Sequence, residues 1–147
     1  MFTIKEIIKT KPVLFNTIEH DTPVFHALHL LKNFDTSYLV VLNQGEFLGL
    51  FSERDYSRKL ILRGRSSKET KVSEVLTRDV PVISINDDLE TCLRLMNAHK
   101  SRYLLVFDDK QELNGVLTMD DLIEHILDAP EKAAAKRTTQ YRKRSIY

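Results

Sequence analysis

Two segments of this chain repeat one pattern, residues 49–55 (GLFSERD) and residues 115–121 (GVLTMDD). Glycine, a hydroxyl side chain and a carboxylate occupy matching places in both segments, and all three are displaced by the same interval. The match continues upstream, where residues 38–41 (YLVV) return as residues 103–106 (YLLV) at an almost identical spacing. Self-similarity at a nearly fixed spacing predicts one structural unit built twice, and turns absorb the small drift between the segments.

Each copy predicts the same order of elements: strand, helix, strand, strand, helix. The first segment of each copy is extended, and the helix after it has apolar residues three and four apart. The next strand is apolar throughout, and a polar turn joins it to a second strand in a hairpin. The expected elements include extended segments at residues 13–18 and 82–85, strands at 38–42 and 103–107, second strands ending at Ser52 and Thr118, and final helices at about 53–62 and 119–127.

A single unit of this kind leaves one face of its sheet uncovered, so the two units should pack against each other through their sheets. We therefore expect an α/β fold of two β-α-β-β-α repeats packed as one module with a pseudo-twofold axis. The expected boundaries are residues 1–71 for the first repeat with an N-terminal helix and a linker, 72–128 for the second repeat, and 129–147 for a basic C-terminal helix or tail. Residues 72–76 are expected to form one helical turn before the second repeat.

Composition narrows the class of protein. The chain has 147 residues, of which 42% are hydrophobic and 29% charged, and a formal net charge of +1, so no global charge favours nucleic acid or membrane. Cys92 is the single cysteine, which excludes an intramolecular disulfide and predicts a buried small side chain. The charged N-terminus is unlike a secretory signal and no apolar run is long enough for a membrane span, so we expect a cytoplasmic protein.

The repeated Ser/Thr-x-x-Asp motif falls where a strand ends and a helix begins. The hydroxyl can cap that helix, whose first N–H groups favour an anion. A carboxylate one turn later can accept two hydrogen bonds from the 2′,3′-diol of a ribose, and Gly49 or Gly115 leaves room for a flat base between strands. The alternative is a capping box with no ligand, although that box prefers Glu or Gln at the fourth position.

Paired units of this order, with a second strand ending in glycine, two apolar residues, Ser or Thr and then Asp, resemble the CBS (cystathionine-beta-synthase) domain. The resemblance covers about residues 13–127 and indicates a stand-alone tandem pair, a Bateman module. It implies that the carboxylate binds ribose, that the hydroxyl lies near phosphate, and that adenine occupies an apolar slot between the repeats. The ligand would be AMP, ADP, ATP or NAD(H), with no metal.

The two copies differ in charge. Copy one carries Arg54 and Arg58 one helical turn apart, and a basic linker follows them. Copy two has Asp120 beside Asp121, which adds negative charge where a phosphate would lie. Arg102 partly compensates, at a position where family members often place a basic residue facing the ligand. Copy one is therefore the preferred site.

The full set of candidate ligand-binding residues combines both motifs, the linker and the first extended segment. They are Thr17, Ile18, Ser52, Arg54, Asp55, Ser66, Ser67, Lys68, Arg102, Thr118 and Asp121. Two departures from the family pattern are Val40 and Leu105, each of which replaces a proline that is usual in the middle strand. Both residues are apolar, so the slot is kept while its shape changes.

Three functions of different classes follow from the sequence. The first is a regulatory module that binds an adenine nucleotide between the repeats and signals through the packing of a homodimer on an unidentified target. The second is a dimerisation adaptor that is indifferent to nucleotides. The third is nucleic-acid binding through the basic tail, which the near-neutral net charge disfavours. No nucleophilic triad or metal-ligand cluster is apparent, so we expect no enzymatic activity.

Overall fold

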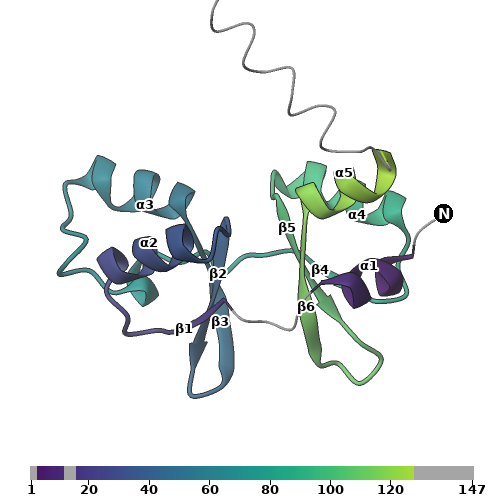
Figure 1. Ribbon diagram of the computed structural model, residues 1–147, viewed down its shortest axis with the longest axis horizontal. Helices are drawn as coiled ribbons and strands as arrows, with labels where there is room; N and C mark the ends of the chain where they lie inside the picture. The colour runs from purple at the N-terminus through teal and green to yellow at the C-terminus, as the bar shows by residue number, and fades with distance from the viewer. Residues whose placement is uncertain (1–2, 12–15, 128–147) are drawn as a thin grey trace, which may run out of the picture.

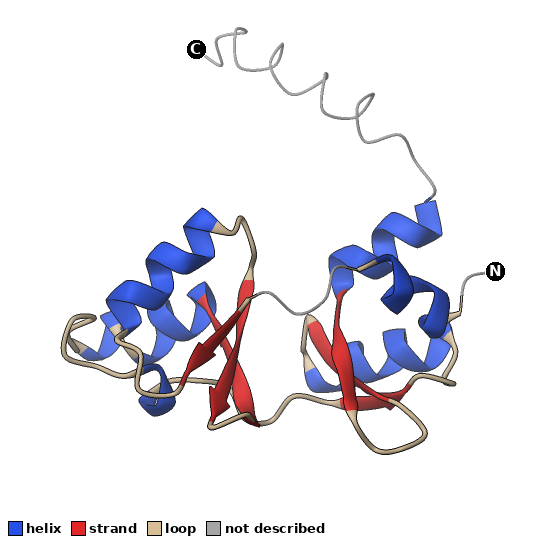
Figure 2. Ribbon diagram, turned by 60° about the horizontal axis from the view of Figure 1, so that its bottom comes forward, coloured by secondary structure: helices blue, strands red, loops and turns tan. Residues whose placement is uncertain are grey.

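The computed structural model describes residues 3–11 and 16–127 and contains two three-stranded sheets that face each other, with helices on their outer sides (Figures 1 and 2). In each sheet the first strand is parallel to the second, which is antiparallel to the third. The strands are β1 (Thr17–Glu19), β2 (Tyr38–Asn43), β3 (Glu46–Ser52), β4 (Val82–Ser84), β5 (Tyr103–Phe107) and β6 (Leu113–Thr118). The predicted fold, a β-α-β-β-α unit built twice, is confirmed.

The repeat extends to details of the backbone. The register of β2 and β3 shifts between Val41 and Leu42, and that of β5 and β6 shifts at the equivalent place, between Val106 and Phe107. The helices that flank the sheets are α2 (Val24–Asn33) and α3 (Glu53–Lys59) in the first repeat, and α4 (Leu89–His99) and α5 (Met119–Leu127) in the second. The predicted basic helix or tail at residues 129–147 lies outside the described residues.

The final helix of the first repeat is shorter than predicted. The pattern predicted a helix to residue 62, but α3 ends at Lys59 and a 3-10 turn, η1 (Ile61–Arg63), follows it. Leu60 leaves the helical conformation and its side chain is fully buried in the core, while its carbonyl accepts bonds from the backbone N–H groups of Arg63 and Arg65. Burial of Leu60 therefore redirects the chain before the periodicity of the sequence ends.

The two repeats pack through their sheets, as the sequence predicted. A core cluster joins Tyr38, Val40 and Leu50 of the first sheet to Leu105 and Val116 of the second. Figure 2 shows the strands meeting at the centre with the helices outside. This contact brings the ends of β3 and β6, and so the two motifs, to the same junction between repeats.

Two segments cross between the repeats: each lies directly before one repeat in the sequence but packs in the core of the other. Helix α1 (Ile4–Thr10) buries Ile4 and Ile7 in the core of the second repeat, and Figure 1 shows it beside the lobe of β4–β6. The turn η2 (Val72–Glu74), which was predicted as a helical turn, precedes the second repeat but packs in the core of the first. Packing therefore crosses the predicted boundary at residue 71 in both directions.

Cys92 is fully buried on α4, and burial, with a smaller effect of Asp87 and Asp88, raises the pKa of its thiol to about 12. Because the thiolate is the reactive form, we expect the native protein to react with Ellman's reagent at pH 8 at least about a hundredfold more slowly than the protein unfolded in guanidinium chloride. Comparable rates in the two states would contradict the buried position.

Candidate functional site

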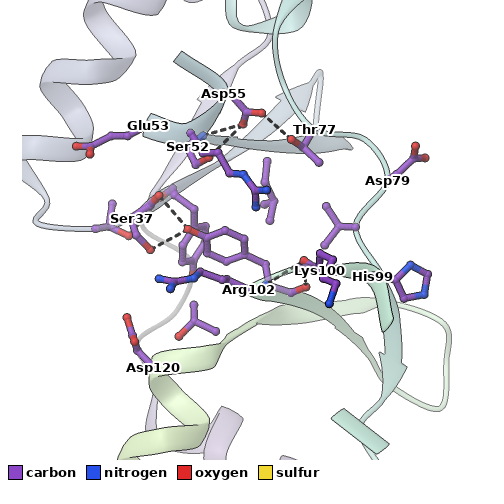
Figure 3. Close-up of a pocket in the computed structure, with 18 of the residues that line it drawn as sticks. Ser37, Ser52, Glu53, Asp55, Thr77, Asp79, His99, Lys100, Arg102 and Asp120 are labelled. Carbon is purple, nitrogen blue, oxygen red and sulfur yellow. Dashed lines mark hydrogen bonds between the residues drawn. The ribbon is translucent and has the colours of Figure 1, made fainter. Parts of the chain in front are cut away.

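A cleft of about 1140 Å³ lies between the repeats and is lined by residues of both motifs. Ser52 and Asp55 line it from the first repeat, and Thr118 and Asp121 from the second. Figure 3 shows Ser52 and Asp55 on one side, with Arg102 and Lys100 reaching the cleft from the other repeat. The volume is slightly above the roughly 300–1,000 Å³ that is usual for small-molecule sites, so a nucleotide would fit.

The cleft brings together about half of the residues predicted from sequence. Those that line it are Ser52, Arg54, Asp55, Arg102, Thr118 and Asp121. The other candidates do not line it. Thr17 and Ile18 belong to β1, where Ile18 is part of the first core cluster. Ser66, Ser67 and Lys68 lie on the loop before η2, where the carbonyl of Ser67 accepts a bond from the N–H of Phe25 and Lys68 lies over the Phe25 ring.

Asp55 is the most fully bonded carboxylate of the cleft, and its side chain is only 6% exposed. Its Oδ2 accepts the backbone N–H of Ser52 at 3.0 Å and the Ser52 hydroxyl at 3.3 Å. Its Oδ1 accepts the Thr77 hydroxyl at 2.7 Å and lies 2.9 Å from the ammonium of Lys59. These four donors occupy the acceptor positions of a carboxylate, and two of them are hydroxyls.

Asp121 has a different environment. Its Oδ2 accepts the backbone N–H of Thr118 at 2.8 Å, and the N–H of Asp121 donates to the Thr118 hydroxyl at 3.0 Å, which completes a capping box. The ammonium of Lys11 lies 2.7 Å from the same Oδ2. The predicted capping alternative is thus present at both motifs, since the carboxylate accepts the N–H of the hydroxyl residue in each.

Two tyrosines at equivalent positions of the repeat line the centre of the cleft. Tyr38 and Tyr103 have ring centroids 5.3 Å apart, and the Tyr103 hydroxyl lies 3.2 Å from the carbonyl and 3.1 Å from the hydroxyl of Ser37. Burial raises the pKa of Tyr103. The loops that lead into both tyrosines share a left-handed residue, Asp35 (φ 50) and Lys100 (φ 52). The same backbone turn therefore presents an acid in one repeat and a base in the other.

The charges of the cleft are balanced in number but not in placement. Six basic side chains, Lys11, Arg54, Arg58, Lys59, Lys100 and Arg102, and six carboxylates, Asp35, Glu53, Asp55, Asp79, Asp120 and Asp121, line it. Lys11 and Lys59 pair with the two motif carboxylates. The four other cations are exposed and form no ion pair within the described residues. The summed charge of the cleft therefore does not attract an anion, and an anion would be bound by individual basic side chains.

Gly49 has a different role from the one expected. The sequence suggested that the glycine leaves room for a base, but a Cβ at Gly49 would lie 2.4 Å from the carbonyl oxygen of Thr77 and 2.7 Å from Leu76. A Cβ at Gly115 would meet only the Cδ1 of Ile8, at 3.6 Å. The space beside Gly49 is filled by Leu76 and Thr77, which follow η2, so this glycine permits that segment to pack on the first repeat.

Sequence reasoning missed several residues of the cleft, above all Lys11, Thr77 and the tyrosine pair. The tyrosines carried a signal, because they occupy the same place in both copies of the repeat. Lys11 and Thr77 carried little sequence signal. Lys11 contacts Asp121 only because α1 packs on the second repeat, and Thr77 contacts Asp55 only because the segment after η2 packs on the first. Within residues 3–11 and 16–127, no helix is long and apolar enough to cross a membrane, and no group of three or more His, Cys, Asp or Glu side chains is placed to hold a metal ion.

Comparisons with known proteins agree with this architecture. Residues 4–61 and 72–128 both match the CBS domain family. A solved structure of a protein with CBS domains from Burkholderia ambifaria MC40-6 superposes with a TM-score of 0.79 at 30% identity, over 86% of this chain and 95% of that one. The CBS domain-containing protein CBSX3, mitochondrial, of Arabidopsis thaliana is 30% identical over 112 residues, 73% of this chain and 54% of that protein.

A further relative is an enzyme. Inosine-5'-monophosphate dehydrogenase of Methanocaldococcus jannaschii is 28% identical over 109 residues, which are 74% of this chain but only 21% of the enzyme. The chain thus spans about half or less of these curated relatives. Two family matches, two sheets of equal topology and a cleft lined by both motifs lead to one identification. The chain belongs to the CBS domain family and contains two CBS domains in tandem.

Proposed function

We propose that this chain is a regulatory module that binds an adenine nucleotide in the cleft between its two CBS domains. One observation carries the proposal: the cleft joins a buried carboxylate, Asp55, to four exposed cations drawn from both repeats. Adenine is proposed because proteins of this family commonly bind adenine nucleotides. The role is one of binding and not of catalysis.

Asp55 is the proposed acceptor for the ribose diol. Two of its four donors are the hydroxyls of Ser52 and Thr77, and these can rotate away. Two ribose hydroxyls would then replace two protein hydroxyls, which leaves the number of hydrogen bonds unchanged. Lys59 would stay in place and keep the carboxylate neutralised. This like-for-like exchange supports the sequence-based preference for the first repeat.

The remaining parts of a nucleotide have suitable surroundings in the same cleft. Arg54 and Arg58 of α3 and Arg102 of the second repeat are exposed guanidinium groups, which bind phosphate through paired N–H donors. Tyr103 offers aromatic surface to the flat face of a base. Occupancy would therefore link the two repeats.

We further propose that the signal passes through self-association. Ile123, Ile126 and Leu127 on α5 are 44%, 48% and 63% exposed, and apolar side chains gathered on one helix favour contact with another subunit. In a homodimer formed by packing of α5, a change in the cleft would reach the second subunit, since α5 begins directly after the motif residue Thr118.

The proposal predicts stabilisation by the ligand. A nucleotide at 100 times its dissociation constant stabilises by about 2.7 kcal/mol, which raises the melting temperature of a module of this size by roughly 5–11 °C. We expect a shift of this order with at least one of AMP, ADP, ATP, NAD and NADH in a thermal denaturation screen. The absence of any shift beyond about 2 °C with all five would contradict nucleotide binding and favour a dimerisation adaptor.

A further inference from the structure

We propose that Lys11 determines how many nucleotides the cleft accepts, because its ammonium closes the second motif carboxylate, Asp121, to a ribose. The inference rests on the proposed function and deepens it, since it limits the chain to one ligand, bound at Asp55. The evidence is the set of contacts that Lys11 makes in the cleft, with Asp121 and Val116 of the second repeat and Tyr38 of the first.

Two of the three donors of the Lys11 ammonium form hydrogen bonds, and the ammonium also contacts an aromatic ring. One bonds to Asp121 Oδ2 at 2.7 Å, a second bonds to the carbonyl oxygen of Val116 at 2.5 Å, and the ammonium lies 5.8 Å from the centroid of the Tyr38 ring. A lysine has three N–H donors and no acceptor, so at most one is left for a phosphate, and the charge of Lys11 is already paired with Asp121. Lys11 therefore acts on the cleft more as an occupant than as an anion-binding residue.

The position of Lys11 is fixed by the fold. It is the C-cap of α1, where its backbone N–H donates to the carbonyl of Ile8. Ile4 and Ile7 of that helix are buried in the second repeat. The helix thus holds the lysine against Asp121 before any ligand arrives. An intramolecular partner held in place competes strongly with a free ligand, because its ordering cost has already been met by folding.

The residue equivalent to Lys11 in the other half of the molecule is Thr77, and it explains why the two motif carboxylates differ. Thr77 follows Lys11 at the same interval that separates the two motifs, and its hydroxyl donates to Asp55 as the Lys11 ammonium does to Asp121. A ribose hydroxyl can replace a threonine hydroxyl on equal terms. On Asp121 the Lys11 ammonium and the Thr118 N–H occupy Oδ2, so a diol that bridges both carboxylate oxygens must displace Lys11. That breaks an ion pair whose side chains are only 21% and 19% exposed, so solvent screens the pair incompletely.

The test makes the two halves alike with the substitution Lys11→Thr and counts bound adenosine by equilibrium dialysis with labelled ligand. Adenosine carries the ribose and the base but no phosphate, so the lost positive charge does not bias its binding. We expect one adenosine per chain in the wild-type protein and two in Lys11→Thr. Lys11→Met should also gain the second site, whereas Lys11→Arg and the exposed control Lys9→Met should keep one.

The outcomes separate this inference from the proposed function. Equal adenosine binding by the wild-type protein and by both neutral variants, whether one per chain or none, overturns the role of Lys11. Weaker binding in Lys11→Thr and Lys11→Met also overturns it, since Lys11 would then contact the ligand. Failure of every nucleotide to stabilise the wild-type protein overturns the proposed function, whereas a site gained only in the variants still supports the inference. Circular dichroism of each variant checks that α1 remains folded.

Discussion

Replacing Gly49 by alanine is expected to reduce the free energy of unfolding by about 3 kcal/mol, whereas the same change at Gly115 leaves it nearly unaltered. The added methyl group at residue 49 would lie 2.4 Å from the backbone oxygen of Thr77. That backbone cannot retreat freely, because Leu50 and Thr77 exchange two backbone hydrogen bonds of 2.9 and 2.8 Å. At residue 115 the nearest atom is 3.6 Å away, an ordinary contact.

Urea denaturation of both variants measures this difference directly, and the melting temperature of Gly49→Ala should fall by roughly 6–12 °C. Gly115→Ala is the matched control, because it occupies the same position of the repeated motif and carries the same gain from a less flexible unfolded chain. Similar losses at both positions would mean that glycine serves the strand itself and not the packing of the segment after η2.

The second large effect is expected on ligand affinity. Asp55→Asn should weaken binding of the nucleotide that gives the largest thermal shift by about tenfold or more, because an amide offers one acceptor oxygen without charge where a carboxylate offers two. Asp121→Asn should change the affinity by less than about threefold, since Asp121 is already paired with Lys11. Titration calorimetry of both variants provides the comparison, and the reverse order would make the second repeat the main site.

Asp55 also contributes to stability, which the sequence did not suggest. The motif alone gives no reason for a loss of stability, because a helix cap at Ser52 does not require Asp55. The structure shows instead that Asp55 is buried and bonded to Ser52, Thr77 and Lys59. Asp55→Asn should therefore cost about 1–3 kcal/mol of unfolding free energy, and its affinity must be measured well below its melting temperature.

The fold could be predicted from sequence because its signals are local and occur twice. Apolar runs and turn residues define each strand, and the motif of residues 49–55, repeated at 115–121, defines where each second strand ends. The end of α3 was predicted less well, because burial of Leu60 is a tertiary effect that periodicity does not contain. Local patterns thus predicted which elements form more accurately than the residues at which they end.

The cleft could be predicted only in part, for a similar physical reason. The motif residues Ser52, Asp55, Thr118 and Asp121 line it because strand ends meet where the sheets pack. The basic linker suggested phosphate donors at residues 66–68, but this loop packs on α2. Lys11 enters the cleft because α1 crosses to the second repeat, and no short-range pattern encodes that crossing.

A crystal structure of the chain grown with a saturating concentration of the nucleotide that stabilises it most would test the proposed site most directly. We predict density for one nucleotide in the cleft, with its ribose hydroxyls on Asp55, its phosphate near Arg54, Arg58 or Arg102, and the ion pair of Lys11 with Asp121 intact. A cleft without the nucleotide, or a ribose on Asp121 with Lys11 displaced, would contradict the assignment.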